Sequence, residues 1–261
     1  MRPPQPGRPR LRKREVVFAV AAGVLAAGGA ALILDESNDG PPFVAAQGPD
    51  SLTDLAPFEA IATVGPQDVV VTYGETQSVR AEGASDTLAL LEVVSEGGVL
   101  RIQPRDGGWQ WAWSRLNSTT YFVTVPRLTS VTLEGSGDIR VDKVEAPAFS
   151  GAIEGSGDLS IDSMKVDRAE FTISGSGDIT AAGTASEARL SIEGSGNIRA
   201  NGLRSQTASV SVEGPGDAKL TVDRLANVSL EGPGDVEIDG SARCTVTQDG
   251  PGDVDCEGDT D

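Results

Sequence analysis

A short glycine-rich motif recurs through the second half of the chain at nearly constant spacing. Its first copy reads Glu-Gly-Ser-Gly-Asp-Ile, later copies vary at single positions, and Pro replaces Ser in the last three. The first glycine stands at positions 135, 155, 175, 194, 214, 232 and 250. The intervals are 20, 20, 19, 20, 18 and 18 residues. Such a period predicts a solenoid, in which each repeat forms one coil and packs only against its neighbours.

Apolar residues alternate with polar ones on both sides of the motif. Around the first copy, Val131 and Leu133 precede it, Ile139 and Val141 follow it, and Thr132 separates the first pair. Alternation with period two is typical of strands that turn one face to a core. A coil of this length is too short for a strand plus a full helix, and a propeller blade needs about 40 residues. We therefore expect short strands stacked about 4.8 Å apart around continuous aliphatic ladders.

The motif itself predicts a tight corner. Its paired glycines permit positive φ, and the proline of the later copies favours a bend. The aspartate that follows is expected to accept backbone N–H groups of that bend, as in an Asx turn.

These aspartates are also candidate metal ligands, because stacked coils would place them in a column along one corner. The column consists of Asp138, Asp158, Asp178, Asp217, Asp235 and Asp253. Stacked carboxylates repel one another, and bound Ca²⁺ would relieve this with oxygen ligands. The alternative is a solvated column that only caps its turns. Both interpretations stay open, and no other cofactor is expected.

The repeats resemble the bacterial "putative auto-transporter adhesin, head GIN domain" family, whose hallmark is a recurring Gly-Ser-Gly-Asp-Ile coil. The resemblance covers residues 57–256, beginning in segments 58–61 and 65–71, passing through 100–102 and entering the repeats at 125–131. It implies an all-β fold, a single-stranded right-handed parallel β-helix with coils of about 18–20 residues, exposed outside the cytoplasm. It supplies no catalytic residues.

The amino-terminal segment predicts a helix that targets or anchors the chain. Residues 16–34 are a run of 19 apolar or glycine residues that follows a basic stretch and stops at Asp35. That length crosses about 30 Å of hydrocarbon as a helix. The basic flank should stay in the cytoplasm. The remainder is then held at a bacterial inner membrane with a periplasmic or extracellular domain, or is released to the periplasm or cell surface if the helix is a cleaved signal.

The predicted organisation follows from these segments. Residues 1–35 form the basic region and hydrophobic helix, 36–56 a linker rich in Pro and Gly, 57–256 the β-helix domain, and 257–261 an acidic tail.

Charge and composition exclude several functions. The 261 residues carry a net charge of −18 and no histidine. Without histidine, Ser-His-Asp, Cys-His and His-zinc chemistry are excluded within the chain. So acidic a surface repels phosphate backbones, so nucleic acid is not an expected partner.

Two further features are candidate sites. Trp109, Trp111 and Trp113 would share one face of an extended segment, either as a stacking platform for a glycan or protein or as a cover for the amino-terminal end of the core. Cys244 and Cys256 lie at equal distances before and after Gly250. They are expected either to form a disulfide that seals the carboxyl-terminal end of the core or to be two buried thiols.

The sequence therefore favours a non-catalytic, adhesin-like binding or structural module of the cell envelope, tethered through its amino-terminal helix and contacting a glycan or envelope protein. One alternative is a carbohydrate-active β-helix enzyme, a polysaccharide lyase or hydrolase. That enzyme would need carboxylates set apart from their neighbours, whereas the repeats make them alike. Another alternative is an assembly or sensory partner of a membrane protein.

Overall fold

The computed structural model describes residues 55–105 and 119–259, and this part of the chain is almost entirely β-strand. The strands before the repeats are β1 (Ala60–Gly65), β2 (Asp68–Tyr73), β3 (Ser78–Glu82), β4 (Leu91–Glu96), β5 (Val99–Pro104) and β6 (Thr120–Val125). Those of the repeats are β7 (Ser130–Gly135), β8 (Ile139–Val141), β9 (Val144–Gly155), β10 (Leu159–Gly175), β11 (Ile179–Gly194), β12 (Ile198–Glu213), β13 (Ala218–Glu231), β14 (Val236–Gly240), β15 (Arg243–Asp249) and β16 (Val254–Cys256).

Within these two ranges, helix is confined to two single turns, α1 (Ser85–Leu88) and the 3-10 turn η1 (Glu257–Asp259). No helix within the described ranges is long and apolar enough to span a membrane. The predicted helix at residues 16–34 lies outside those ranges.

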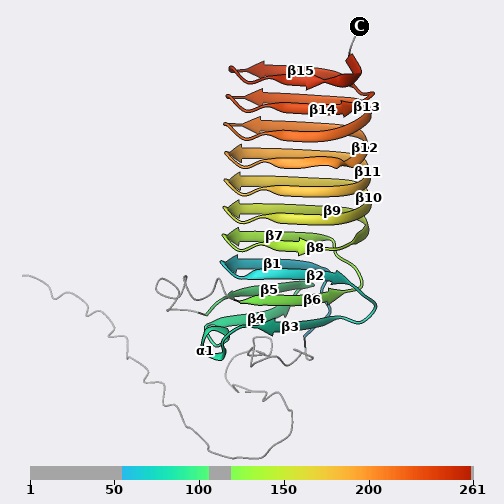
Figure 1. Cartoon of the computed structure of the whole chain (residues 1–261). Coiled ribbons are helices and arrows are strands. Elements are labelled where there is room, and N and C mark those ends of the chain that lie inside the picture. The colour runs from blue at the N-terminus through green and yellow to red at the C-terminus, as the bar shows by residue number, and fades with distance from the viewer. Residues whose placement is uncertain (1–54, 106–118, 260–261) are drawn as a thin grey trace, which may run out of the picture. The chain divides into compact units, whose positions relative to one another are not determined.

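The strands form a β-solenoid of about six turns, as the repeat predicts. From β7 onward each strand pairs in parallel with its equivalent in the next coil, in the order β7, β9, β10, β11, β12 and β13 (Figure 1). The period of the sequence is thus the path length of one coil.

The apolar residues of the alternating pattern face the inside of the solenoid, and the polar residues between them face outward. One inward row runs through the coils in strict register as Ile153, Ile173, Ile192, Val212 and Leu230. All five side chains are fully buried. Because every coil adds another member to such rows, the aliphatic core is continuous along the axis.

Before the repeats, the expectation of a single-stranded parallel β-helix throughout residues 57–256 is wrong. β3 pairs with β6 and β4 pairs with β5 in antiparallel fashion. Moreover, β5 pairs with β1 on the side away from β7. The chain therefore runs from the coil of β1 and β2 into the strands at the end of the stack, and then returns past that coil to β7. Leu88 of α1 and Leu91 of β4 are buried there and cover the end of the core, which a stack of parallel coils would leave open to water.

Candidate functional site

The repeated corner is built on backbone contact between coils. Gly135 has φ 138° and Gly155 has φ 139°, a region that glycine alone enters without strain. The second glycine of the motif is required for a different reason, the close approach of the neighbouring coil. A Cβ on Gly157 would lie 1.9 Å from the carbonyl oxygen of Gly137 in the preceding coil, so the spacing of the coils leaves no room for a side chain.

The stack of corners begins one coil before the repeats, at Gly65-Pro-Gln-Asp68. Gly135 stacks on Gly65, and Gln67 occupies the place of the second glycine. Gln67 is fully buried, and its Nε2 donates to Oγ1 of Thr63 at 2.7 Å and to the carbonyl of Val64 at 2.9 Å. A glutamine fits here because this corner is the first of the stack among the described residues, and its Nε2 also donates to the carbonyl of Ile102 on β5, the strand beneath β1, at 3.4 Å.

The aspartate column connects coils rather than closing its own turns. The N–H of Asp158 donates to Oδ1 of Asp138 at 3.1 Å, and the N–H of Asp178 donates to Oδ1 of Asp158 at 2.9 Å. In return, the carbonyl of Asp158 accepts the N–H of Ile139 from the coil before. The expected Asx cap of the bend is replaced by a ladder that ties each coil to the next.

The ladder continues through every motif, and Asn197 substitutes for aspartate without interrupting it. Its remaining bonds join Asp138 to Asp68, Asn197 to Asp178, Asp217 to Asn197, Asp235 to Asp217, and Asp253 to Asp235, at 2.9–3.1 Å.

Asp178 is the best-satisfied carboxylate of the column. It accepts hydrogen bonds from the backbone and side chain of Asn197, at 2.9 and 2.8 Å, and from Arg199 at 2.6 Å. Burial acts to raise the pKa of Asp178, but the hydrogen bonds from Arg199 and Asn197 outweigh it and hold that pKa below its ordinary value. Arg199 thus offsets the charge repulsion of the column at this point.

Calcium binding by the column remains a hypothesis. Among residues 55–105 and 119–259, no group of three or more acidic or cysteine side chains is arranged to hold a metal ion. One oxygen of each carboxylate from Asp138 to Asp235 already accepts a hydrogen bond in the coil-to-coil ladder, which gives the aspartate a structural reason to recur.

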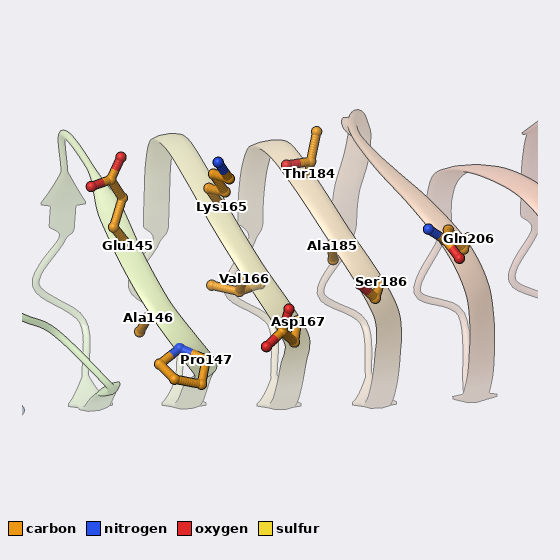
Figure 2. Close-up of a pocket in the computed structure, with 10 residues that line it drawn as sticks. All are labelled: Glu145, Ala146, Pro147, Lys165, Val166, Asp167, Thr184, Ala185, Ser186 and Gln206. Atoms are coloured by element: carbon orange, nitrogen blue, oxygen red, sulfur yellow. The ribbon is translucent and has the colours of Figure 1, made fainter.

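A different feature, which we did not identify from the sequence, is a shallow groove of about 590 Å³ on another face of the solenoid. Figure 2 shows its lining as equivalent residues of successive coils. Ala146, Val166 and Ala185 form the floor, with Val166 and Ala185 buried. The walls are Glu145, Lys165 and Thr184 on one side and Pro147, Asp167, Ser186 and Gln206 on the other.

The groove runs parallel to the axis because the same bend recurs in each coil. The register aligns Glu145, Lys165 and Thr184 across the coils, and Ala146, Val166 and Ala185 beside them. Small floor residues keep the groove open, while both charge signs and hydroxyls line it. Small residues at nearly the same distance after each motif were the signal in the sequence that could have indicated it.

Two acidic groups whose pKa values are raised, Asp239 and Tyr121, lie away from this groove. Burial, followed by the neighbouring charges of Glu237 and Glu257, raises the pKa of Asp239 on β14. Burial likewise raises the pKa of Tyr121 on β6, and Arg105 opposes the shift. Neither Asp239 nor Tyr121 lines the groove.

The other two candidates from the sequence have different outcomes. Trp109, Trp111 and Trp113 lie outside the described residues; the described ends of their segment, Arg105 and Thr119, follow β5 and precede β6. Cys244 and Cys256 are joined by a disulfide in the last coil, with Cα atoms 6.5 Å apart.

Taken with its repeated corner and groove, the fold defines the chain as a β-solenoid repeat protein. The chain belongs to the "putative auto-transporter adhesin, head GIN domain" family, whose model matches residues 57–242. This confirms the resemblance inferred from the motif. A comparison with curated proteins finds no match.

Solved structures share the fold. A putative adhesin from Bacteroides fragilis has a TM-score of 0.73 at 21% identity, over 79% of this chain and 94% of the other. A putative lipid binding protein from Parabacteroides distasonis has a TM-score of 0.64 at 17% identity, over 80% and 96%. A putative adhesin from Parabacteroides merdae has a TM-score of 0.63 at 18% identity, over 79% and 94%. At these identities the likeness establishes the fold and not the function.

Proposed function

We propose that the chain is a non-catalytic, adhesin-like binding module of the bacterial envelope, and that the groove between Pro147 and Gln206 takes an extended ligand such as a glycan strand. The observation that supports this most is the geometry of the groove. Equivalent positions recur coil after coil along a straight line, which suits a polymer with repeating units better than a compact molecule.

The chemistry of the lining supports binding rather than turnover. Lys165, Asp167 and Thr184 offer donors and acceptors to hydroxyl groups, and the apolar floor offers contact to a sugar face. A glycoside hydrolase would need two carboxyl groups in defined positions, one with a raised pKa. The groove lining holds two carboxylates, Glu145 and Asp167, and Glu145 is paired with Lys143 at 2.9 Å.

The proposal includes how the domain is held. Residues 16–34 act as an uncleaved membrane anchor or a cleaved signal, and residues 36–56 as the linker, so that a right-handed solenoid stands in the periplasm or outside the cell. The length of the apolar run and the basic flank support this. Trp109, Trp111 and Trp113 are proposed as a second contact for the same ligand, and Ca²⁺ as an optional ligand of the aspartate column.

The test is a binding screen of the full chain against envelope polysaccharides and envelope protein fractions, with calcium and with chelator. Ser186→Trp would fill the groove from its exposed rim, whereas Ser209→Trp places the same ring at an exposed position outside it. Binding that Ser186→Trp weakens at least about tenfold and Ser209→Trp leaves unchanged would support the groove. Binding unaffected by Ser186→Trp but lost on substitution of the three tryptophans would move the site to that segment.

A further inference from the structure

A second, smaller hollow adjoins the groove on the side toward the coil of β7. Its volume is about 280 Å³, and it is lined by the segment before β7 and by strands β9 and β10. Pro147 lines both hollows, so the smaller one lies next to the groove. Its charged lining residues are Arg127, Arg168 and Glu170, and we call it the arginine pocket.

We infer that the arginine pocket binds the carboxylate of an acidic sugar unit, so that the ligand of the groove is a carboxylated glycan. The inference rests on the proposed function, because it names the class of polymer that the groove takes. Three properties of the pocket support it, namely the donors of its two arginines, its balance of charge, and the hydroxyl and apolar groups around them.

The two arginines have donors available for a ligand. Arg168 donates to Glu187 through Nε at 3.3 Å, and the Nε of Arg127 lies 3.7 Å from a carboxylate oxygen of Glu59. Within the described part of the chain, the terminal amino groups of Arg127 and Arg168 donate no hydrogen bond. Both side chains are exposed, at 46% and 57%. Guanidinium groups bind carboxylates through paired N–H donors, so this arrangement suits a carboxylate ligand.

The charge around the pocket favours an anion. Its lining holds two arginines and one carboxylate, Glu170. Glu187, the partner of Arg168, also accepts a hydrogen bond from Arg189 at 3.4 Å, so one carboxylate serves two guanidinium groups. The whole chain has a net charge of −18 and repels anions over most of its surface. No member of the aspartate column lines the pocket, which makes it a place where a carboxylate can be held.

The rest of the lining suits a sugar better than a simple carboxylate ion. Thr129 and Ser150 bring half-buried hydroxyl groups, and Glu170 lies in register with Ser150 on the neighbouring strand. The carboxylate of Glu170 can accept a hydrogen bond from a sugar hydroxyl. Pro147 and Ala148 are exposed and give an apolar wall against which the face of a sugar ring can pack.

The groove offers a further cation to the same polymer. Lys165 lines the groove and forms no ion pair within residues 55–105 and 119–259. Figure 2 shows it on the coil that follows Glu145 and Pro147. A chain of acidic sugars that leaves the arginine pocket past Pro147 would therefore meet a second positive charge, whereas Asp167 on the opposite wall can accept hydroxyl groups.

The experiment is calorimetric titration of the full chain in detergent with polygalacturonate, alginate and hyaluronate. Each polymer is compared with the same polymer after its carboxyl groups have been reduced to alcohols. We expect at least one of them to bind about tenfold or more tightly than its reduced form, because the reduced form cannot make charge-assisted hydrogen bonds to the arginines.

Variants then locate that preference in the arginine pocket. Arg127→Gln/Arg168→Gln should abolish the preference for the carboxylated polymer and leave the melting temperature unchanged, since both side chains are exposed. Arg224→Gln is the matched control, because Arg224 is an exposed arginine that lines neither hollow, and it should leave the preference in place.

Equal affinity for every carboxylated polymer and its reduced form would overturn the inference. So would a preference that survives Arg127→Gln/Arg168→Gln, or one that Arg224→Gln reduces as much as the double variant does. Binding of neutral polymers alone would overturn the arginine pocket and leave the proposed binding function in place. Binding of neither charged nor neutral polymers would overturn the proposed function itself, so the two failures are distinguishable.

Discussion

The backbone N–H of Asp178 donates to Oδ1 of Asp158, a side chain 20 residues earlier and 2.9 Å away. The same relation repeats from Asp68 to Asp253, so the aspartate of each motif is the acceptor for the next coil. Neutral asparagine continues the ladder at position 197, which indicates that the acceptor oxygen, and not the charge, is what the corner requires.

Replacing Asp158 tests this role. Asp158→Ala leaves the N–H of Asp178 without its acceptor and should lower the free energy of unfolding by about 1–2 kcal/mol. Asp158→Asn keeps an acceptor oxygen and should cost much less. Chemical denaturation of both variants measures the difference, and equal losses would show that charge rather than the acceptor is needed.

Asp178 should contribute to the acid sensitivity of the domain. Its pKa is lowered from 3.8, with burial opposing the shift and hydrogen bonds from Arg199 and Asn197 outweighing it. A carboxyl group whose folded pKa is depressed stabilises the fold above its unfolded pKa, and that stabilisation is lost as pH falls through the folded pKa.

Asp178→Asn should therefore lower the melting temperature at neutral pH, and the difference from wild type should shrink as pH falls below about 4. Asp158→Asn is the matched control, because Asp158 accepts the same backbone bond and no arginine contacts it among the described residues. A difference for Asp178→Asn that stays constant with pH would contradict the assignment.

Close approach of the coils should make the second glycine of the motif intolerant of any side chain. Gly157→Ala would place a Cβ 1.9 Å from the carbonyl oxygen of Gly137 and should cost about 3 kcal/mol or more. Gly98→Ala is the comparison, since it has φ 83° but nothing within 4 Å of the added atom, and should cost about 1 kcal/mol. Thermal melts of the two variants should differ clearly; similar losses would mean that the coils can separate at no great cost.

The disulfide of the last coil should stabilise the end that carries β15. Cys244 and Cys256 have a sequence separation of 12. Opening a loop of this size by reduction should lower the free energy of unfolding by about 3 kcal/mol. Hydrogen exchange of β15 and β16 should rise in Cys244→Ser/Cys256→Ser while exchange of β9 to β12 stays slow. Intact mass before and after reduction and alkylation establishes whether the bond is present in the isolated protein.

The solenoid and its core rows could be predicted from the repeats, because every coil from Gly135 onward has the same alternation of apolar and polar residues around the motif. The antiparallel end from β3 to β6 could not be predicted in this way. Residues 74–129 carry no motif, and their pairing partners are determined by which edges the stack leaves uncovered.

The candidate sites show the same division. The sequence identified the aspartates, but it suggested a bond within the turn, since the acceptor relation from Asp138 to Asp158 exists only once the coils are stacked. The groove was not predicted because Ala146, Val166 and Ala185 are ordinary small residues in the sequence. They form a groove floor only once the coils are stacked and these residues are aligned.

The central claim is that the solenoid binds an extended ligand and leaves it unchanged. The most direct measurement is calorimetric titration of the full chain with the envelope polysaccharide that binds best, followed by chromatographic sizing of the recovered polymer. The account predicts saturable binding that Ser186→Trp weakens, with the length of the polymer unchanged after prolonged incubation. Shortened polymer chains generated by the wild-type protein would contradict it, and would make the chain a hydrolase or lyase.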